Sequence, residues 1–240
     1  MKSIVISVDV EQDCPPFLDT KHGVEEGLPQ LLELFRKEGI QATFFTTGQI
    51  AEAYPGLIRQ ILEQGHELGC HGYSHKCFDR MDLKEARAEI RAAKTILEQL
   101  HRPIESFRAP NLRFPPEYIG LLEEQGFRID SSLALYKPPF ARQVSTIGSI
   151  RRLPVTLTSS LIRSPLPVIL PLLSWIDDPV IFVHPWEFID MSNTPVRFDC
   201  KFNTGIKALE NLKAIIRRLK SKGYRFLSTR ERVALAQACV

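Results

Sequence analysis

Residues 4–13 read Ile-Val-Ile-Ser-Val-Asp-Val-Glu-Gln-Asp, a short apolar run that passes directly into acidic residues. Such a run is typical of a strand that is buried on both faces in a parallel sheet. Side chains two residues apart on a strand point the same way, so Asp9, Glu11 and Asp13 should share one side at its carboxyl end. Three neighbouring carboxylates repel one another unless a cation or a proton offsets them. The stretch predicts either a cation site or an ordinary acidic surface turn.

Further strand-like runs occur along the rest of the chain, where short β-branched runs alternate with longer amphipathic stretches. This alternation indicates βαβ units, and 240 residues is a usual length for a single β/α barrel. We therefore expect an α/β fold, a distorted (β/α) barrel of about seven parallel strands that forms one domain over residues 1–240. The expected strands are Ile4–Val8, Ala42–Thr46, His66–Cys70, Phe107–Ala109, Phe127–Asp130, Pro179–Val183 and Tyr224–Leu227.

Charge and cysteine content exclude several classes of protein. The formal net charge is only +3 and the basic residues are scattered, so we expect no nucleic-acid partner. The five cysteines have no disulfide-framework spacing, and residues 1–8 are too short for the apolar region of a signal peptide. We therefore expect a cytoplasmic protein, with the inner membrane face as a second location.

Residues 153–175 are strongly apolar but are interrupted by four prolines. A transmembrane helix needs about 20 apolar residues in unbroken helical geometry, so this segment should not cross a membrane. The favoured interpretation is a buried loop and short helix that cover the barrel. The alternative is an apolar lip that meets a lipid-linked substrate or a membrane surface, and the sequence does not separate the two.

A pair of histidines, His71 and His75, follows the third expected strand. Residues four apart converge on one side of a helical turn, which is suitable spacing for metal ligands, although such pairs also arise by chance. In a β/α barrel the carboxyl ends of the strands face the active site, where these histidines and the acids of residues 9–13 would meet. Two imidazoles and one carboxylate suit zinc, cobalt, nickel or manganese. The combination favours a metal site.

The order of the motifs resembles that of the polysaccharide deacetylase family, the NodB-homology domain of carbohydrate esterase family 4. In that family an acidic motif after the first strand is followed by H-(S/T)-x-x-H, then by R-x-P, and finally by a late H-P. The resemblance extends over nearly the whole chain and implies a barrel that carries a deacetylase site. The matching residues are Asp9 and Glu11, His71 and His75, Arg108-Ala109-Pro110, and His184-Pro185.

Three departures from the family pattern concern the site. Asp9-Val10-Glu11 replaces two adjacent aspartates, a form that resembles the branch acting on lipid-linked amino sugars and some peptidoglycan deacetylases. Gly72 stands where serine or threonine is common. Asn111 and Leu112 stand where the family has an aromatic residue and a glycine. We therefore expect a substrate wall that differs from that of the chitin and peptidoglycan enzymes.

The resemblance also implies a role for each matching residue. Asp9 would take a proton from water, Arg108 would hold Asp9 in place, and His184 would protonate the departing nitrogen. Asp130 would steer His184, and a backbone amide near Asn111 would complete an oxyanion site. Zinc is the expected metal, and cobalt, nickel and manganese are alternatives. The implied ligands are Glu11, His71 and His75, with Asp13 in competition with Glu11; the implied substrate-binding residues are Tyr73, Pro110, Asn111, Asp130 and Trp186.

The expected function is metal-dependent hydrolysis of a C–N amide bond. The substrate would be an N-acyl amino sugar, free, polymeric or lipid-linked, that loses an acetyl or formyl group. One alternative is a hydrolase of a non-sugar amide or cyclic ureide on the same barrel. Another is a metal-free carbohydrate-binding module. The expected partners are an N-acylated sugar or sugar-lipid and, through peripheral contact, a membrane; the sequence predicts no oligomeric state.

Overall fold

A computed structural model of the chain describes residues 2–137 and 145–237. Its strands form one sheet in the order β6-β7-β5-β4-β3-β2-β1-β8, with β9 also paired to β1. Every pair is parallel except β6 with β7. The strands are β1 (Ser3–Val10), β2 (Thr43–Thr46), β3 (Glu67–Cys70), β4 (Ser106–Phe107), β5 (Ile129–Asp130), β6 (Ser145–Ile147), β7 (Ile150–Arg152), β8 (Val180–Val183) and β9 (Arg225–Leu227).

The sheet curls around β1 into an open, distorted barrel. On one edge of β1, Val5 pairs with Val180 of β8. On the other edge, Val5 pairs with Leu227 of β9, and the later residues of β1, from Ser7 to Val10, pair with β2. Thr156 bridges β8 to the chain that follows β7, because its amide and its hydroxyl both donate to the carbonyl oxygen of Val180. The predicted architecture is confirmed, and all seven expected strands are present. The sequence missed the β6–β7 hairpin.

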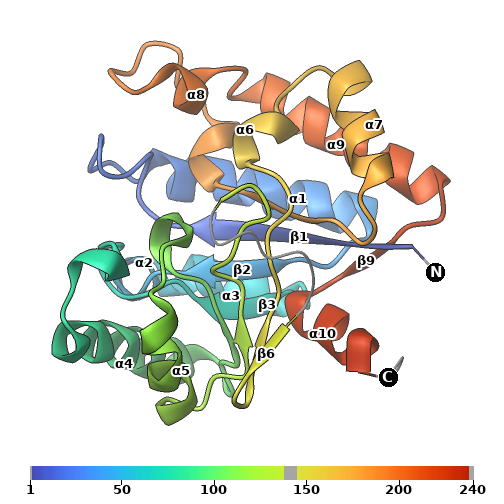
Figure 1. Cartoon of the computed structure of the whole chain (residues 1–240). Helices are drawn as coiled ribbons and strands as arrows, with labels where there is room; N and C mark the ends of the chain where they lie inside the picture. Colours follow the sequence, from blue (N-terminus) through green and yellow to red (C-terminus); the bar gives the residue numbers. More distant parts are fainter. Residues whose placement is uncertain (1, 138–144, 238–240) are drawn as a thin grey trace.

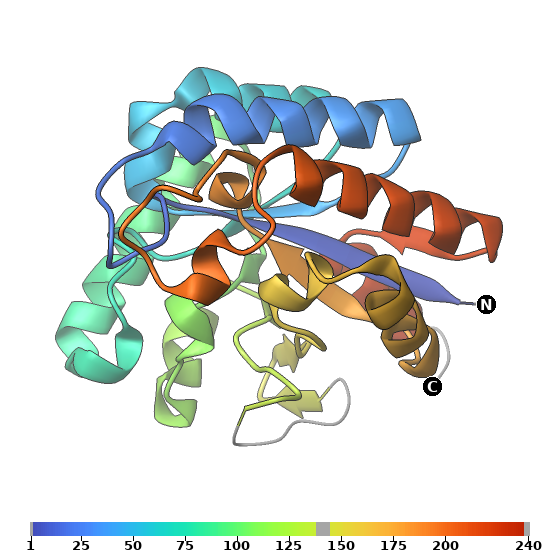
Figure 2. The same ribbon diagram turned by 90° about the horizontal axis from the view of Figure 1, so that it is seen from above.

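Helices cover the outer side of the curled sheet, with α1 and α9 side by side (Figures 1 and 2). Gly39 ends α1 in the left-handed conformation that glycine adopts readily, with φ at 55°. The helices are α1 (Leu28–Glu38), α2 (Gly48–Ala53), α3 (Pro55–Glu63), α4 (Leu83–Leu100), α5 (Ile119–Glu124), α6 (Ser159–Ile162), α7 (Leu166–Trp175), α8 (Phe198–Lys201), α9 (Ile206–Ser221) and α10 (Thr229–Gln237).

Alternation along β1 separates the core from the site. The even-numbered side chains from Ile4 to Val10 belong to the large apolar core beneath the helices. The odd-numbered side chains line the barrel, where Val5 packs in a smaller apolar cluster and Ser7 and Asp9 accept hydrogen bonds from Arg108. The interior therefore changes from apolar to polar toward the carboxyl end of β1, as period-two geometry requires.

The apolar segment 153–175 buries some of its side chains against the rest of the protein and exposes others to solvent. Ile169 and Leu173 on the inner side of α7 are buried, whereas Val168 and Trp175 are 51% and 83% exposed. Among the described residues, no helix has the length and apolar character needed to cross a bilayer.

Two glycines allow the segment just before α1 to contact the chain that follows β8. They bound η1 (Gly23–Gly27), a π-helical turn that packs on η5 (Pro185–Phe188), a 3₁₀ turn. A Cβ atom at Gly27 would lie 2.1 Å from the carbonyl oxygen of Pro185, and one at Gly23 would lie 2.4 Å from the amide nitrogen of Trp186. Both distances are far below van der Waals contact, so the two backbones meet with no side chain between them.

Gly27→Ala should therefore lower the free energy of unfolding by about 1–3 kcal/mol, the usual cost of overpacking, as measured by denaturant unfolding. The control is Gly56→Ala in α3, where an added Cβ meets nothing within 4 Å. That control should leave stability unchanged or raise it by up to ~1 kcal/mol, because alanine favours a helix more than glycine. Equal effects of the two substitutions would refute the close backbone contact.

Candidate active site

The carboxyl ends of β1, β3, β4 and β8 bring together residues that lie far apart in the sequence. Residues that follow each of these strands contact one another, as expected for the active-site end of a β/α barrel. A pocket of about 400 Å³ opens at this end. Of the predicted site residues, its walls include Asp9, Glu11, His71, His75, Asn111, His184 and Trp186.

Glu11, His71 and His75 form a buried three-ligand cluster. Oε2 of Glu11 lies 3.2 Å from Nε2 of His71 and 2.6 Å from Nε2 of His75, and the candidate ligand atoms all lie within 4.8 Å of one another. Nδ1–H of His71 donates to the carbonyl oxygen of Arg108 at 2.7 Å. In the neutral ring this bond leaves the Nε2 lone pair free to face Glu11, the orientation that metal-binding histidines usually show. The donor set fits a divalent cation.

The histidines converge through a loop and not through the helical turn that the sequence predicted. Gly72 and His75 both have left-handed backbones, with φ of 73° and 60°. Glu89 of α4 holds the loop by accepting hydrogen bonds from the amides of Tyr73 and Ser74 and from the Ser74 hydroxyl. A non-glycine residue in this conformation is uncommon, and such strain is often found at functional sites.

Asp13 does not join the cluster, so the expectation that all three acids share one side is wrong. Its Oδ2 accepts from the Thr20 hydroxyl at 2.7 Å and from the His22 amide at 2.9 Å, and its Oδ1 accepts from the Gly23 amide at 2.9 Å. Both oxygens therefore hold the loop that leads into η1. Of the two competing carboxylates, Glu11 is the one placed to bind a cation.

The surroundings of Glu11 favour its charged form. Burial alone would raise its pKa, but His75, then His184 and His71, hold that pKa well below the usual range. The anionic carboxylate is the form that a metal needs.

Arg108 holds Asp9 at the base of the pocket. The guanidinium is completely buried, and its Nη1 donates to Oδ1 of Asp9 at 2.7 Å and to the Ser7 hydroxyl at 2.8 Å. Its Nη2 donates to the Ser131 hydroxyl at 2.9 Å, and its carbon lies 4.2 Å from the centre of the Phe45 ring. These contacts fix one oxygen of Asp9 through a charge-assisted hydrogen bond.

His184 faces the oxygen of Glu11 that is turned away from His71 and His75. Its Nε2 is 3.8 Å from Oε1 of Glu11, and its ring stacks on Trp186 with centroids 4.8 Å apart. Burial would lower the pKa of His184, but the charges of Glu11 and Glu187 outweigh burial and raise that pKa to about 9. The imidazole is therefore cationic at neutral pH, with a proton available on Nε2.

Glu187 orients His184, a role that sequence reasoning missed. Its Oε1 accepts from Nδ1–H of His184 at 2.7 Å, and its Oε2 lies 2.9 Å from Nε of Arg163. The second contact lacks the alignment of a hydrogen bond, so it acts as a charge contact. Burial would raise the pKa of Glu187, but Arg163 and then His184 lower it. The sequence did contain a signal for this role, because Glu187 stands three positions after His184, the spacing of a capping box. The structure forms this capping box at the start of η5.

Asp130 does not orient His184, which corrects that prediction. Its Oδ2 accepts from Nε of Arg152 at 2.8 Å, its Oδ1 accepts from the Ser132 amide, and the side chain is fully buried. Pro110 is also buried, near Gly72, and neither Asp130 nor Pro110 lines the pocket of the site. Both support the walls of the site instead.

Asn111 and Tyr73 lie at the edge of the site. Asn111 lines the pocket with a left-handed φ of 58°, and the amide of the following Leu112 donates back to Ala109. The backbone N–H of Asn111 is thus the candidate donor in this turn for contact with an oxyanion. Tyr73 lines a neighbouring pocket of about 830 Å³, and its hydroxyl donates to Glu52. The two pockets share Asn111 and His75.

Comparison with known proteins agrees with this arrangement. The family model described as polysaccharide deacetylase matches residues 2–129, more than half of the chain. The chain belongs to the polysaccharide deacetylase family. The family predicted from the order of motifs is therefore confirmed.

A peptidoglycan deacetylase of Helicobacter pylori is 34% identical over 110 residues, which are 45% of this chain and 38% of that relative. The chain thus aligns with less than half of the length of this curated relative. The peptidoglycan deacetylase PdaC of Bacillus subtilis has the same fold, with a TM-score of 0.64 at 16% identity over 99% of this chain and 92% of that one.

A pseudoenzyme of carbohydrate esterase family 4 from Bacillus anthracis also has a TM-score of 0.64, at 17% identity over 96% of this chain and 64% of that one. Both deacetylase and pseudoenzyme share the fold, so the fold of this family member does not establish activity by itself. The side chains of the site must support that inference.

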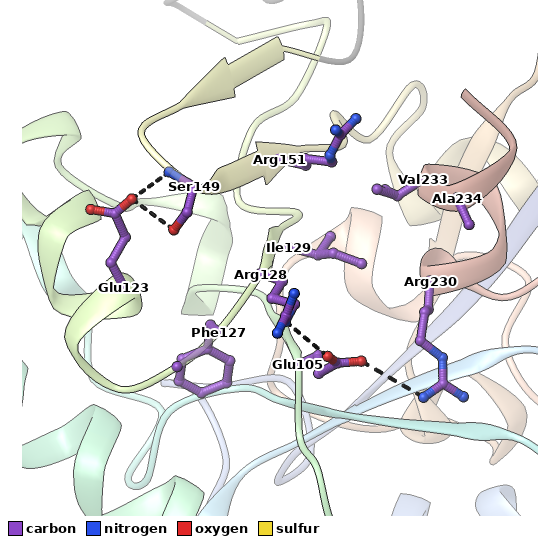
Figure 3. Close-up of a pocket in the computed structure, with 11 residues that line it drawn as sticks. Glu105, Glu123, Phe127, Arg128, Ile129, Ser149, Arg151, Arg230, Val233 and Ala234 are labelled. Atoms are coloured by element: carbon purple, nitrogen blue, oxygen red, sulfur yellow. Dashed lines mark hydrogen bonds and ion pairs between the residues drawn. The ribbon is translucent and has the colours of Figure 1, made fainter. Parts of the chain in front are cut away.

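Another pocket lies away from this site, near the amino ends of β4 and β5 (Figure 3). There Glu105 pairs with Arg128 at 3.1 Å and with Arg230 of α10 at 3.8 Å. None of the predicted site residues lines this pocket, and in β/α barrels this end serves stability.

Loss of one imidazole should weaken the metal binding that the three-ligand cluster predicts. We expect His75→Ala to bind zinc at least tenfold more weakly, because two ligands remain where three were present. Zinc content after dialysis, measured by mass spectrometry, checks this. His101→Ala, at the end of α4, is the matched control and should retain zinc; equal retention by both variants would exclude His75 as a ligand.

Removal of the charge on Glu187 should impair the proton donation that the sequence predicts for His184. We expect Glu187→Gln to lower kcat for an amide by about 10–100-fold, within the range of general acid catalysis, and to change KM little. An aryl ester has a leaving group that needs no proton, so its hydrolysis should fall much less. Equal losses on the amide and the ester would point to a structural defect.

Proposed function

We propose that this chain is a metal-dependent hydrolase that removes an acyl group, acetyl or formyl, from the nitrogen of an amino sugar. One observation carries the proposal. Asp9 and His184 line the same pocket as the Glu11–His71–His75 cluster, and each is held by a buried partner of opposite charge. A base, an acid and a metal site are the groups that amide hydrolysis requires.

We propose the following reaction at these residues. Asp9 accepts a proton from the attacking water, whose oxygen bonds to the amide carbon, while Arg108 keeps the carboxylate in place. His184 then donates its Nε2 proton to the nitrogen as the C–N bond breaks, while Nδ1 remains bound to Glu187. The products are a free amine and a carboxylic acid. The backbone N–H of Asn111, a residue that lines the same pocket, is the donor that we propose for the oxyanion.

The metal that we propose is zinc, held by Glu11, His71 and His75. A bound divalent ion would polarise the carbonyl and lower the pKa of water toward neutrality. Two imidazoles and one carboxylate are a common ligand set for catalytic zinc.

The substrate class rests on similarity and on the pocket. The Helicobacter pylori relative is named a peptidoglycan deacetylase, which supports an N-acetylated sugar polymer as the general class. The neighbouring pocket, which shares Asn111 and His75 with the site, offers room for a second sugar unit. A lipid-linked amino sugar is a narrower proposal that rests on the Asp9-Val10-Glu11 form of the first motif. The cytoplasmic location stays a prediction.

Asp9→Asn should lower turnover by about 10²–10⁴-fold, because a neutral amide cannot accept the proton of water. Amine release from N-acetylglucosamine oligomers and N-acyl sugar-lipids measures this, and zinc content should remain unchanged. The control is Asp19→Asn, an exposed acid of the loop that follows β1. Near-normal turnover by Asp9→Asn would refute its role as base.

Removal of metal by a chelator should abolish amine release, and added zinc or cobalt should restore it. A sample that contains no metal yet retains full activity would overturn the metal dependence. A cyclic ureide, tested in parallel, would reveal activity toward non-sugar amides.

A further inference from the structure

The outward face of α7 is entirely apolar. Val168, Pro171, Leu172 and Trp175 follow the i, i+3, i+4, i+7 spacing of one helix face. Val168 is 51% exposed and Trp175 is 83% exposed, whereas Ile169 and Leu173 on the opposite face are buried. No charged residue occurs from 164 to 176. We call these four outward residues the α7 face.

Cations at the carboxyl end of α9 border the α7 face on one side. Nζ of Lys222 donates to the hydroxyl of Ser174 at 3.0 Å, which places an ammonium group beside the end of α7. Arg218 lies one helical turn earlier on α9 and is exposed. α7 and α9 lie side by side in both views (Figures 1 and 2). Arg217 and Lys220 instead contact Glu38 of α1, so they belong to another face.

Acidic groups near the α7 face are few. Asp178 is tied to Ser3 and to Arg232, which offsets its charge. Asp177 is the exposed acid that follows the helix. Arg218 and Lys222 therefore give this edge a net positive charge.

We propose that the α7 face docks on the surface of a lipid bilayer that contains anionic lipids. An apolar helix face bordered by cations is the pattern of an interfacial helix, whose apolar side enters the boundary between headgroups and acyl chains. A tryptophan at the end of such a face is typical of that boundary. A symmetric contact with a second copy fits less well, because a second copy presents the same apolar and cationic face and offers no excess negative charge to Arg218 and Lys222.

Docking of this kind is weak and reversible. A ten-residue helix is about 15 Å long, and one short apolar face needs a second, electrostatic contribution for stable attachment. Binding should therefore depend on anionic lipid and decrease with salt.

The two tryptophans of the chain make the test direct. Trp175 is 83% exposed and Trp186 is 5% exposed, so a shift in emission on docking reports Trp175. The full chain is titrated with vesicles of phosphatidylcholine, with and without phosphatidylglycerol. We expect a blue shift and co-sedimentation with the anionic vesicles, and loss of both at high salt.

Three variants separate the contributions. Trp175→Gln should weaken co-sedimentation about tenfold, because a large apolar side chain no longer enters the bilayer. Trp175→Phe should still co-sediment but show no blue shift. Lys222→Gln should weaken binding about fivefold, and mainly at low salt. The matched controls are Leu83→Gln and Lys84→Gln, exposed residues at the start of α4, which should bind as the parent chain does.

Several results would overturn the proposal. These are equal binding to neutral vesicles, no binding to either kind, or Trp175→Gln binding as tightly as the parent chain. A concentration-dependent dimer that Trp175→Gln abolishes, without vesicle binding, would assign the face to a second copy. None of these measurements uses catalysis, so they are independent of the proposed hydrolase activity.

Discussion

The buried guanidinium of Arg108 determines which side chains can lie around it in the interior of the barrel. Arg108 is a cation with no exposed surface, so the interior must supply both a negative charge and hydrogen-bond acceptors. Asp9 supplies the charge, and Ser7 and Ser131 supply hydroxyl acceptors from β1 and from the chain after β5. The carboxylate that would act as the base is therefore also the group that makes a buried arginine tolerable, so structure and chemistry depend on the same pair.

A similar arrangement occurs on the other side of the pocket, with different residues. Glu187 lies between His184 and Arg163, and Arg163 is anchored by the carbonyl oxygens of Asp199 and Phe202. Two of the three acids near the reaction centre thus have an arginine of their own. Glu11 faces the histidines instead, which makes it the carboxylate available to a cation. Differences in partner, more than differences in burial, separate the roles of three acids that are all almost completely buried.

Much of this arrangement could be predicted from the sequence, and the failures have physical causes. Apolar runs such as Ile4–Val8 predicted the strands, because buried parallel strands leave a continuous local signal. The loop that carries His71 and His75 could not be predicted, since its shape depends on two left-handed residues and on Glu89, a residue of α4. The prediction that Asp13 shares one side with Asp9 and Glu11 failed because the two-residue alternation of side chains holds only within the strand, which ends at Val10. α10 was overlooked although Ser228 and Glu231 bond reciprocally at its start, a local pattern that is visible in the sequence.

The contact of η1 with η5 bears on which acyl groups the pocket could admit. Gly23 and Gly27 bring the backbone of one loop onto the backbone of the other, so the loop between Glu11 and α1 packs directly on the segment that follows His184. Movement of either segment alone to admit a bulkier acyl chain would break this contact. Variation in width must come from the remaining walls, at residues such as Tyr136, Thr158 and Ser160. Selectivity among chain lengths would then be tuned by residues that take no part in catalysis.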